Sequence, residues 1–538
     1  MRLSIKSKSK GIILVILSIT LIFLCVTGHP FFKKNKTKIL LIGMDGATWT
    51  VMRPLINDGK LPNIKQLMDK GCWGNLESFY PLTSEVIWTS IATGKSPDKH
   101  GITDRIMEDP DTGELVPPTT NLIKVRTIWN ILSERKKKVG IIGYRMSWPP
   151  EEVNGVMVSD RSDISQYLSK DYSYPPFKDL CSELEFENFG KVNNSIFSCI
   201  DRKKKGIYFD YSVEEQDNFM SNFSEYLLQK QDFDFFSVYL LGIDVLSHHF
   251  WKYLFPEGLE INEEDKERYK DIINDYYIYC DSVIGDLLKK VDKDTTVIIV
   301  SDHGFRESPR KDYYIFSKLN LLLEASGLSE IKMNSKKAFI KDTLGEIIKS
   351  QRGLRIDGDL SNKEFIEVRE WAKEILRDIK VKETNHSIFS ILEDTKTGFI
   401  VDIDYIYINE HPEHHILIKG KEVKIMDFLS PYSFCGGHDK LGVIMISGKN
   451  IYQNKTIETA TIYDITPTIL YLMGLPVGKD MKGKVLVEAI DSDLLRRRPT
   501  RYIDTYETHK KEKIEKPIRS PQDEERIIER MKSLGYIN

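Results

Sequence analysis

The nine residues KILLIGMDG, positions 38–46, carry the strongest strand signal in the chain. A continuous apolar run that ends in Asp45 and Gly46 is typical of a strand buried on both faces of a parallel sheet. Four further runs have the same character: VGIIGY (139–144), FFSVYLLG (235–242), TVIIVS (296–301) and GVIMIS (442–447). Amphipathic helical patterns occur in the stretches between them, at 63–70, 127–135, 213–231 and 265–290. This alternation predicts an α/β fold in which helices cover both faces of a mostly parallel sheet.

The rhythm of strands and helices is interrupted once. Residues 306–430 are rich in Lys, Glu and Asn, and we interpret them as an insertion or cap. The main α/β domain is then predicted in two parts, 38–305 and 431–490, followed by a charged C-terminal tail at 491–538.

Inside the insertion, helical patterns are expected at 315–325 and 363–379, and a strand-like run at 405–408. In the tail, residues 520–534 have a charged helical pattern.

The first 37 residues differ from the rest of the chain. A basic N-terminal region precedes an uncharged run at 11–28, which is long enough to cross a hydrocarbon core of roughly 30 Å. Two interpretations remain open: a cleaved signal peptide, or an uncleaved transmembrane signal-anchor. We therefore expect a membrane-anchored protein whose catalytic domain is extracytoplasmic, or a secreted protein if the segment is cleaved.

Charge and cysteine content exclude several classes. A net charge of −3 lacks the basic excess that binding to a nucleic-acid polymer normally needs. The six cysteines form no C-x-x-C, which excludes a zinc ribbon or a thioredoxin-type site, and none lies in the C-x-P-x-R element of a sulfatase. Cys181 and Cys199 could pair outside the cytoplasm.

Acidic and histidine side chains gather where the predicted strands end. Because open α/β sheets bind ligands at the carboxyl ends of their strands, we expect these side chains to meet. They offer a mixed set of oxygen and nitrogen ligands: Asp45, Asp244, His248, Asp302, His303 and His438. Six such ligands suit two divalent metal ions, with Zn²⁺ as the first choice and Mn²⁺ as the alternative.

A hydroxyl nucleophile is suggested by PLTSEVIWTSIATGKSPDKHGI at 81–102. Thr83 and Ser84 stand at the start of a helix, where either side chain could cap the helix or meet a phosphoryl group. A serine hydroxyl is a weak nucleophile unless a base or a metal activates it, and the ligand set could supply the metal. The residues alone do not decide whether Thr83 or Ser84 would be the nucleophile.

Several motifs, taken in order, resemble the alkaline phosphatase superfamily and, within it, the type I phosphodiesterase/nucleotide pyrophosphatase family. They are LLIGMDGAT, SEVIWTSIATGKSPDKHGI, GIDVLSHHFW, VSDHGF, GGHDKLGVIMISG and TIYDITPTILYLMGLP. The resemblance implies a three-layer α/β/α core and a metal-dependent phosphodiesterase that forms a covalent phospho-seryl intermediate. It also implies Ser84 as the nucleophile, nine residues before Thr93, with Thr83 as the alternative.

The resemblance further implies how the ligands divide between two ions. One ion would take Asp45, Ser84, Asp302 and His303. The other would take Asp244, His248 and His438. The substrate would be a small-molecule or headgroup phosphoester.

One position departs from the family pattern. Nucleotide pyrophosphatases of the family carry Asn three residues after the nucleophile, and this chain has Ile87. Phosphoryl contacts are therefore expected from Glu85 through its backbone N–H, from Lys95 or from Arg145, although Lys95 and Arg145 could equally be ordinary ion-pair residues. A membrane-anchored phosphotransferase, a phosphomonoesterase and an inactive extracellular binding domain are the alternative functions.

Overall fold

The structure is a computed structural model, which describes most of the chain after residue 37. The described residues are 38–80, 82–105, 107–110, 113, 115–161, 171–192, 195–200, 212–257, 261–307, 313–315, 319–333, 336–346, 351–358, 360–394, 398–432, 436–507 and 514. The predicted N-terminal membrane segment and the tail helix at 520–534 lie outside them. No helix within the described ranges is both long and apolar enough to cross a membrane.

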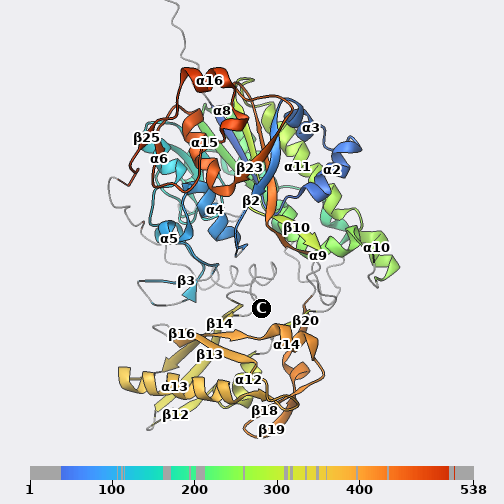
Figure 1. Ribbon diagram of the computed structural model, residues 1–538, viewed down its shortest axis with the longest axis vertical. Helices are drawn as coiled ribbons and strands as arrows, with labels where there is room; N and C mark the ends of the chain where they lie inside the picture. The colour runs from blue at the N-terminus through green and yellow to red at the C-terminus, as the bar shows by residue number, and fades with distance from the viewer. Residues whose placement is uncertain are drawn as a thin grey trace, which may run out of the picture.

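A central sheet organises the larger part of the molecule (Figure 1). Its nine described strands follow the order β23-β2-β22-β9-β1-β8-β5-β6-β7. Their bounds are β1 (Ile39–Met44), β2 (Gly71–Glu77), β5 (Val139–Ile142), β6 (Gly155–Val158), β7 (Ser173–Tyr174), β8 (Phe235–Leu240), β9 (Thr296–Val300), β22 (Leu441–Ser447) and β23 (Lys455–Thr461). Strands β9, β1, β8, β5 and β6 are mutually parallel, while β22 runs antiparallel to β9 and β2. The predicted mostly parallel α/β sheet is confirmed.

Helices pack in two groups against this sheet, as Figure 1 shows. One group contains α4 (Ser84–Thr93), α6 (Ile128–Glu134) and α15 (Ile465–Leu472). The other contains α3 (Pro62–Asp69), α8 (Ser212–Lys230), α9 (Gly242–Leu254) and α11 (Ile272–Leu288). The helix predicted at 265–290 is in fact two helices, α10 (Glu263–Tyr269) and α11, and every residue of α4 is buried.

The insertion has a hydrophobic core of its own, built from residues between Leu319 and Leu429. It contains a five-stranded sheet and a three-stranded sheet. The strands are β12 (Ile331–Met333), β13 (Lys336–Glu346), β14 (Gln351–Gly358), β17 (Gly398–Ile403) and β16 (Phe389–Asp394), then β15 (Lys380–Val381), β18 (His415–Ile418) and β19 (Lys421–Lys424). Helices α12 (Leu319–Ala325) and α13 (Asn362–Asp378) pack on the larger sheet.

The strand expected at 405–408 was wrong. These residues belong to helix α14 (Tyr405–Glu410), which begins after Asp404. The Asp404 carboxylate accepts a hydrogen bond from the backbone N–H of Tyr407, and such a cap favours a helix over a strand.

Two short ladders close the insertion at its base. Strand β10 (Gly304–Glu307) pairs with β21 (Gly436–Asp439), and β11 (Tyr313–Ile315) pairs with β20 (Ser430–Tyr432). The first ladder places Phe305 opposite His438. The two parts of the α/β domain, which the insertion separates in the sequence, are therefore in direct contact in the fold.

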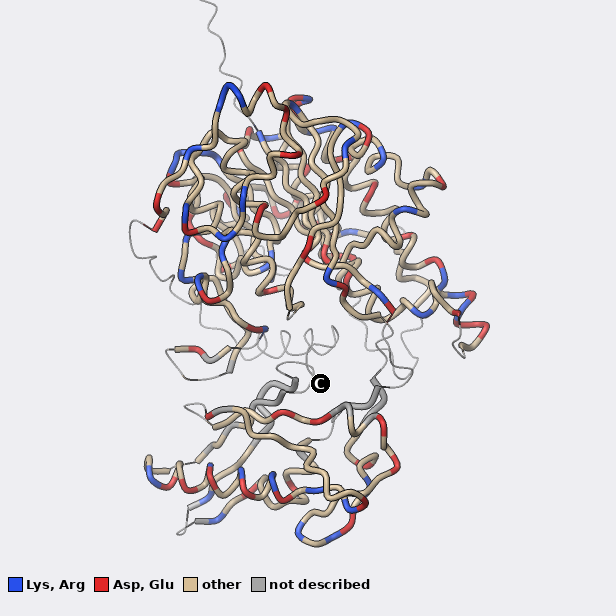
Figure 2. The backbone as a smooth tube through the Cα atoms, in the orientation of Figure 1, with Lys and Arg blue, Asp and Glu red and all other residues tan. Residues whose placement is uncertain are grey.

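The structure also shows how the charged residues are distributed and whether the described cysteines pair. Figure 2 shows basic and acidic residues interspersed over both parts of the molecule, with α13 carrying both signs along its length. Cys72, Cys181, Cys199 and Cys280 are free thiols, so Cys181 and Cys199 do not pair.

Candidate active site

Neighbouring strands bring the predicted ligands to one edge of the sheet. Asp45 follows β1 directly, and Asp302 and His303 follow β9. Helix α9, which begins just after β8, carries Asp244 and His248 in its first two turns. Strands β9, β1 and β8 are adjacent and parallel, so their carboxyl ends bring these side chains to one place. This is the arrangement expected from Asp and His residues near strand ends.

The first group of ligand atoms surrounds His303, which is fully buried. Its Nε2 lies 3.5 Å from Asp45 Oδ1 and 3.4 Å from Asp302 Oδ2. Ser84 Oγ lies 3.5 Å from the same nitrogen. The nucleophile predicted from the sequence therefore faces the predicted ligands.

The second group surrounds Asp244. His438 Nε2 lies 3.2 Å from Asp244 Oδ1, and His248 Nε2 lies 3.5 Å from that oxygen. Asp244 Oδ1 is also 3.8 Å from His303 Nε2, and the rings of His303 and His438 stack with centroids 3.6 Å apart. The two groups are thus continuous, and the division of ligands between two ions stays a prediction.

The three imidazoles are oriented in the same way. Each Nδ1 faces a backbone carbonyl oxygen: Gly436 O for His248 (3.3 Å), Gly304 O for His303 (3.1 Å) and Leu82 O for His438 (2.9 Å). A carbonyl only accepts, so in the neutral rings Nδ1 carries the proton and Nε2 carries a lone pair. The Nε2 atoms of His248 and His438 nevertheless approach to 2.9 Å. Two facing lone pairs repel unless a cation lies beside them. A hydrogen bond from Nδ1 to a carbonyl, which leaves Nε2 available, is typical of metal-ligating histidines.

The carboxylates leave oxygens directed at the same point. Asp45 Oδ2 accepts hydrogen bonds from Trp88 Nε1 (3.2 Å) and from the Tyr239 hydroxyl. Asp302 Oδ1 accepts from the Gly46 N–H at 3.3 Å. The other oxygens, Asp45 Oδ1 and Asp302 Oδ2, are buried and accept no hydrogen bond within the described residues. Buried polar atoms without a partner are costly, and a divalent cation would satisfy both.

The pKa shifts of the three carboxyl groups also indicate that a positive charge would stabilise the cluster. Burial and the nearby Asp244 raise the pKa of Asp45 to about 7. Burial and the negative charges of Asp45 and Asp244 raise the pKa of Asp302 well above its ordinary value. Burial opposes ionisation of Asp244 too, but the neighbouring imidazoles outweigh it and lower its pKa. Three carboxylates that repel one another in a buried space fit a divalent metal centre.

Ser84 is the first residue of α4 and is almost completely buried. Thr83 occupies the N-cap position, but its side chain makes no capping hydrogen bond. Its backbone carbonyl accepts from the N–H groups of Val86 and Ile87. Because Ser84 Oγ faces His303, the geometry is compatible with Ser84 as the nucleophile, and the choice between the two hydroxyls stays a prediction.

Two arginines converge on the residue after Ser84. Arg145 Nη2 forms an ion pair with Glu85 Oε1, and Arg105 Nε lies 3.8 Å from Glu85 Oε2. Burial would raise the pKa of Glu85, but these two guanidinium groups lower it below its ordinary value. The positive charge of Arg145 also opposes the rise that burial causes in the pKa of Asp45. Arg105 could not be predicted from the sequence, because it lies in no motif.

Two other residues singled out from the sequence do not join the cluster. Lys95 follows the C-cap of α4, at the end opposite Ser84, and its Nζ pairs with Asp480 (2.6 Å) and Glu507 (2.8 Å). Its ammonium group is thus held by two carboxylates, which favours the ordinary ion-pair interpretation, and a phosphate contact by Lys95 stays a prediction. Ile87 is completely buried in the core.

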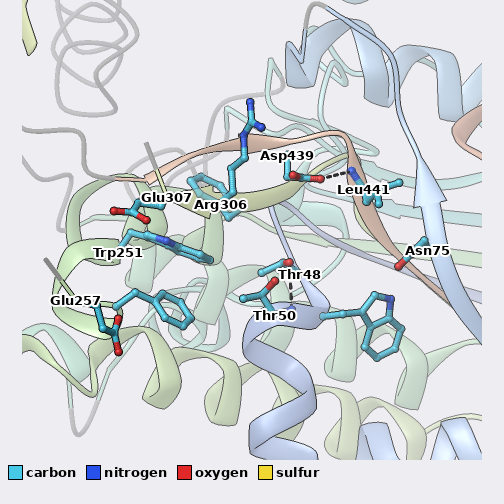
Figure 3. A pocket seen from close by; sticks show the side chains of 12 residues that line it. Thr48, Thr50, Asn75, Trp251, Glu257, Arg306, Glu307, Asp439 and Leu441 are labelled. Carbon is cyan, nitrogen blue, oxygen red and sulfur yellow. Dashed lines mark hydrogen bonds between the residues drawn. The ribbon is translucent and has the colours of Figure 1, made fainter. Parts of the chain in front are cut away.

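A cavity of about 460 Å³ is lined by residues of α9, β10 and neighbouring segments (Figure 3). Phe305 lines this cavity and also contacts two of the candidate ligands. Its ring lies 4.9 Å from the ring of His248 and 5.2 Å from that of His438. Trp251 and Arg306 line the same cavity, and in Figure 3 the Arg306 side chain points away from its interior.

Comparisons with known proteins agree with this geometry. A family model described as type I phosphodiesterase / nucleotide pyrophosphatase matches residues 39–394, which include every predicted ligand except His438. No curated protein sequence matches the chain.

Solved structures that resemble the chain share little sequence with it. Human ectonucleotide pyrophosphatase / phosphodiesterase 5 is 14% identical, with a TM-score of 0.46, and the match covers 85% of this chain and 100% of that chain. Phosphonoacetate hydrolase from Sinorhizobium meliloti, in complex with phosphonoacetate, is 14% identical, with a TM-score of 0.45 and coverage of 81% and 95%. The inactive murine ectonucleotide pyrophosphatase / phosphodiesterase 5, in complex with AMP, is 13% identical, with a TM-score of 0.44 and coverage of 82% and 95%.

Proposed function

The chain belongs to the type I phosphodiesterase/nucleotide pyrophosphatase family and is a phosphoric ester hydrolase, and we propose that it cleaves phosphodiesters through Ser84 at a two-metal centre. The observation that carries the proposal is the convergence of Ser84 Oγ with buried carboxylate oxygens and imidazole Nε2 atoms on one point. Two carboxylates with open oxygens and three imidazoles with Nε2 lone pairs suit Zn²⁺, with Mn²⁺ as the alternative.

The residues divide the chemistry among them. Divalent ions held by Asp45, Asp244, Asp302 and the three histidines would favour the ionised Ser84 hydroxyl and offset the charge of the phosphoryl group. Ser84 Oγ would form a bond to phosphorus as the bond to the leaving alcohol breaks, giving a phospho-seryl ester. Water would then release the phosphoryl group and restore the Ser84 hydroxyl. Trp88 and Tyr239 would hold Asp45 Oδ2, so that Oδ1 keeps its orientation.

Hydrolysis of a generic diester tests the proposal directly. The purified full chain is expected to hydrolyse bis-p-nitrophenyl phosphate, to lose that activity in a strong chelator and to regain it when Zn²⁺ or Mn²⁺ is returned. The comparison of the two metals, each added alone to the chelated protein, identifies the better cofactor. Activity that survives complete removal of bound metal, verified by elemental analysis, would contradict the proposal.

Arg145 is proposed to bind a phosphoryl oxygen in place of the missing asparagine at Ile87. Its guanidinium pairs with Glu85, the residue after the proposed nucleophile, and its positive charge opposes the rise that burial causes in the pKa of Asp45. We expect Arg145→Ala to lower kcat/KM by roughly 10- to 100-fold, because a charge-assisted contact to phosphate is lost, and Arg145→Lys to recover part of it.

Lys95→Ala is the matched control for Arg145→Ala. Its loss breaks two buried ion pairs, so the melting temperature should fall while kcat/KM of the remaining folded protein stays near that of the wild type. Equal kinetic losses in the two variants would remove Arg145 from the phosphate site.

Phosphomonoester hydrolysis is the second candidate function. It is favoured by the pair of arginines around Glu85, since a monoester carries an additional negative charge that cationic groups can offset. The ratio of kcat/KM for bis-p-nitrophenyl phosphate to that for p-nitrophenyl phosphate, measured on one preparation, separates the two functions.

For the N-terminus we propose a signal-anchor at 11–28, with the catalytic domain outside the cytoplasm. N-terminal sequencing of the mature protein decides between an anchor and a cleaved signal peptide, because cleavage would leave a chain that begins near His29.

A further inference from the structure

A second cluster of metal-ligand side chains lies in the insertion, apart from the catalytic residues. The sequence HPEHH at 411–415 supplies its three side chains, two histidines and one glutamate. His411, Glu413 and His414 each offer one ligand atom, and these three atoms all lie within 4.8 Å of one another. Their neighbours belong to the separate core of the insertion, so this cluster is not part of the catalytic centre.

A tight turn creates the cluster. The backbone N–H of His414 donates to the carbonyl of His411 at 3.2 Å, which closes a turn with Pro412 and Glu413 at its centre. Pro is favoured at the first central position of such turns. The turn joins α14 to β18 and brings the rings of His411 and His414 into a parallel stack with centroids 4.7 Å apart.

The distances suit a tetrahedral ion after small side-chain movements. Glu413 Oε1 lies 3.6 Å from His414 Nε2 and 4.0 Å from His411 Nδ1. Ligands about 2.1 Å from a tetrahedral zinc are about 3.4 Å from one another. Glu413 is largely exposed and His411 is 41% exposed, so both side chains have room to close the difference.

A hydrogen-bond chain orients His414 for this role. Its Nδ1 lies 3.1 Å from the Tyr407 hydroxyl, which lies 2.5 Å from Thr384 Oγ1. If His414 Nδ1–H donates to Tyr407 and Tyr407 donates to Thr384, every hydrogen bond is satisfied and Nε2 presents a lone pair to Glu413. The ring of Tyr407 is held by His386, which stacks on it at 4.1 Å. Metal-ligating histidines typically have a second nitrogen fixed in this way.

We propose that His411, Glu413 and His414 bind a Zn²⁺-type divalent ion, with water in the fourth position. Two imidazoles and one carboxylate favour a borderline transition metal over Mg²⁺ or Ca²⁺, which prefer oxygen ligands throughout. The ion ties the end of α14 to the start of β18 and so stabilises the insertion.

Metal stoichiometry tests the site independently of catalysis. The purified full chain is dialysed to equilibrium against buffered free Zn²⁺, and bound metal per chain is measured by elemental analysis. We expect the His411→Ala and His414→Ala variants to bind one Zn²⁺ fewer than the wild type, with unchanged hydrolysis of bis-p-nitrophenyl phosphate. His415→Ala is the matched control: the Nδ1 of His415 pairs with Glu383 at 2.9 Å, so its removal should leave the stoichiometry unchanged.

A more conservative variant sharpens the test. Tyr407→Phe keeps the ring that stacks on His386 but removes the hydroxyl that orients His414, so the number of sites should stay the same while Zn²⁺ affinity falls about tenfold. The side chain of His411 is 41% exposed, against 18% for His414, so His411→Ala is the less disruptive change and answers the question even if His414→Ala fails to fold. Equal stoichiometry in the wild type and His411→Ala, or an equal loss in His415→Ala, would overturn the proposal.

Discussion

Replacement of Ser84 by Ala is expected to lower kcat/KM for diester hydrolysis by roughly 10³-fold or more, because the reaction loses the atom that bonds to phosphorus. The substitution removes one buried hydroxyl at the start of α4 and leaves the carboxylates and imidazoles in place. Steady-state kinetics on bis-p-nitrophenyl phosphate, with bound metal measured on the same samples, tests the expectation. Circular dichroism confirms that the variant is folded.

Two matched variants locate the nucleophile. Thr83→Ala removes the neighbouring hydroxyl, which makes no capping hydrogen bond, so activity should remain within a few fold of the wild type. Ser84→Thr keeps a hydroxyl at the same position and should retain measurable activity. If Thr83→Ala is inactive and Ser84→Ala is active, the nucleophile has been assigned to the wrong one of two adjacent residues.

The second large effect is expected for Asp302→Asn. This substitution should lower the activity but raise the stability of the metal-free protein. Activity should fall by roughly 10³-fold, since a neutral amide binds a divalent ion poorly and one open oxygen of the centre is lost. The metal-free protein, however, should become more stable by roughly 1–3 kcal/mol, because a buried carboxylate that repels Asp45 and Asp244 has been removed.

The pH dependence of the stability gain follows from the raised pKa of Asp302. In the metal-free wild type the folded state holds this proton more tightly than the unfolded state, so the group destabilises the fold progressively as pH rises above about 4. The gain from Asp302→Asn should therefore be larger at pH 8 than at pH 5. Denaturant unfolding of both chelated proteins at the two pH values measures it.

Asp281→Asn is the matched control for a buried carboxylate outside the centre. Asp281 accepts a hydrogen bond from the Ile64 N–H at 2.8 Å and two more from Asn63. The substitution should destabilise the protein and leave metal binding unchanged. A loss of stability in metal-free Asp302→Asn would show that the cluster is not electrostatically strained.

The predictable part of the fold was the part buried on both faces. Five apolar runs became β1, β5, β8, β9 and β22, because strands covered by helices on both sides must be apolar throughout. Strand β2 (GCWGNLE) was missed, since it alternates between buried and exposed residues and contains two glycines. The sheet of the insertion was missed because its strands, such as KKAFIKDTLGE in β13, interleave charged residues among few apolar ones.

The clustering of the candidate ligands could be predicted because most of them follow strand ends, whereas the residues that orient them could not be predicted. Tyr239 lies inside β8 and reads as ordinary core, yet its hydroxyl contacts Asp45. The backbone carbonyls of Leu82, Gly304 and Gly436 that fix the three imidazoles have no sequence signature at all. Both depend on which segments the tertiary fold brings together.

The ladder between β10 and β21 joins two segments that are made at different times during synthesis. His438 lies directly across from Phe305, two residues after His303, but the ribosome adds it only after the entire insertion. At about 5–20 residues per second, the nascent chain waits on the order of ten seconds between its fifth protein ligand and its last. A ribosome-bound chain halted before residue 436 therefore lacks one imidazole of the proposed metal centre, and metal binding by such a chain should be weaker than by the full chain.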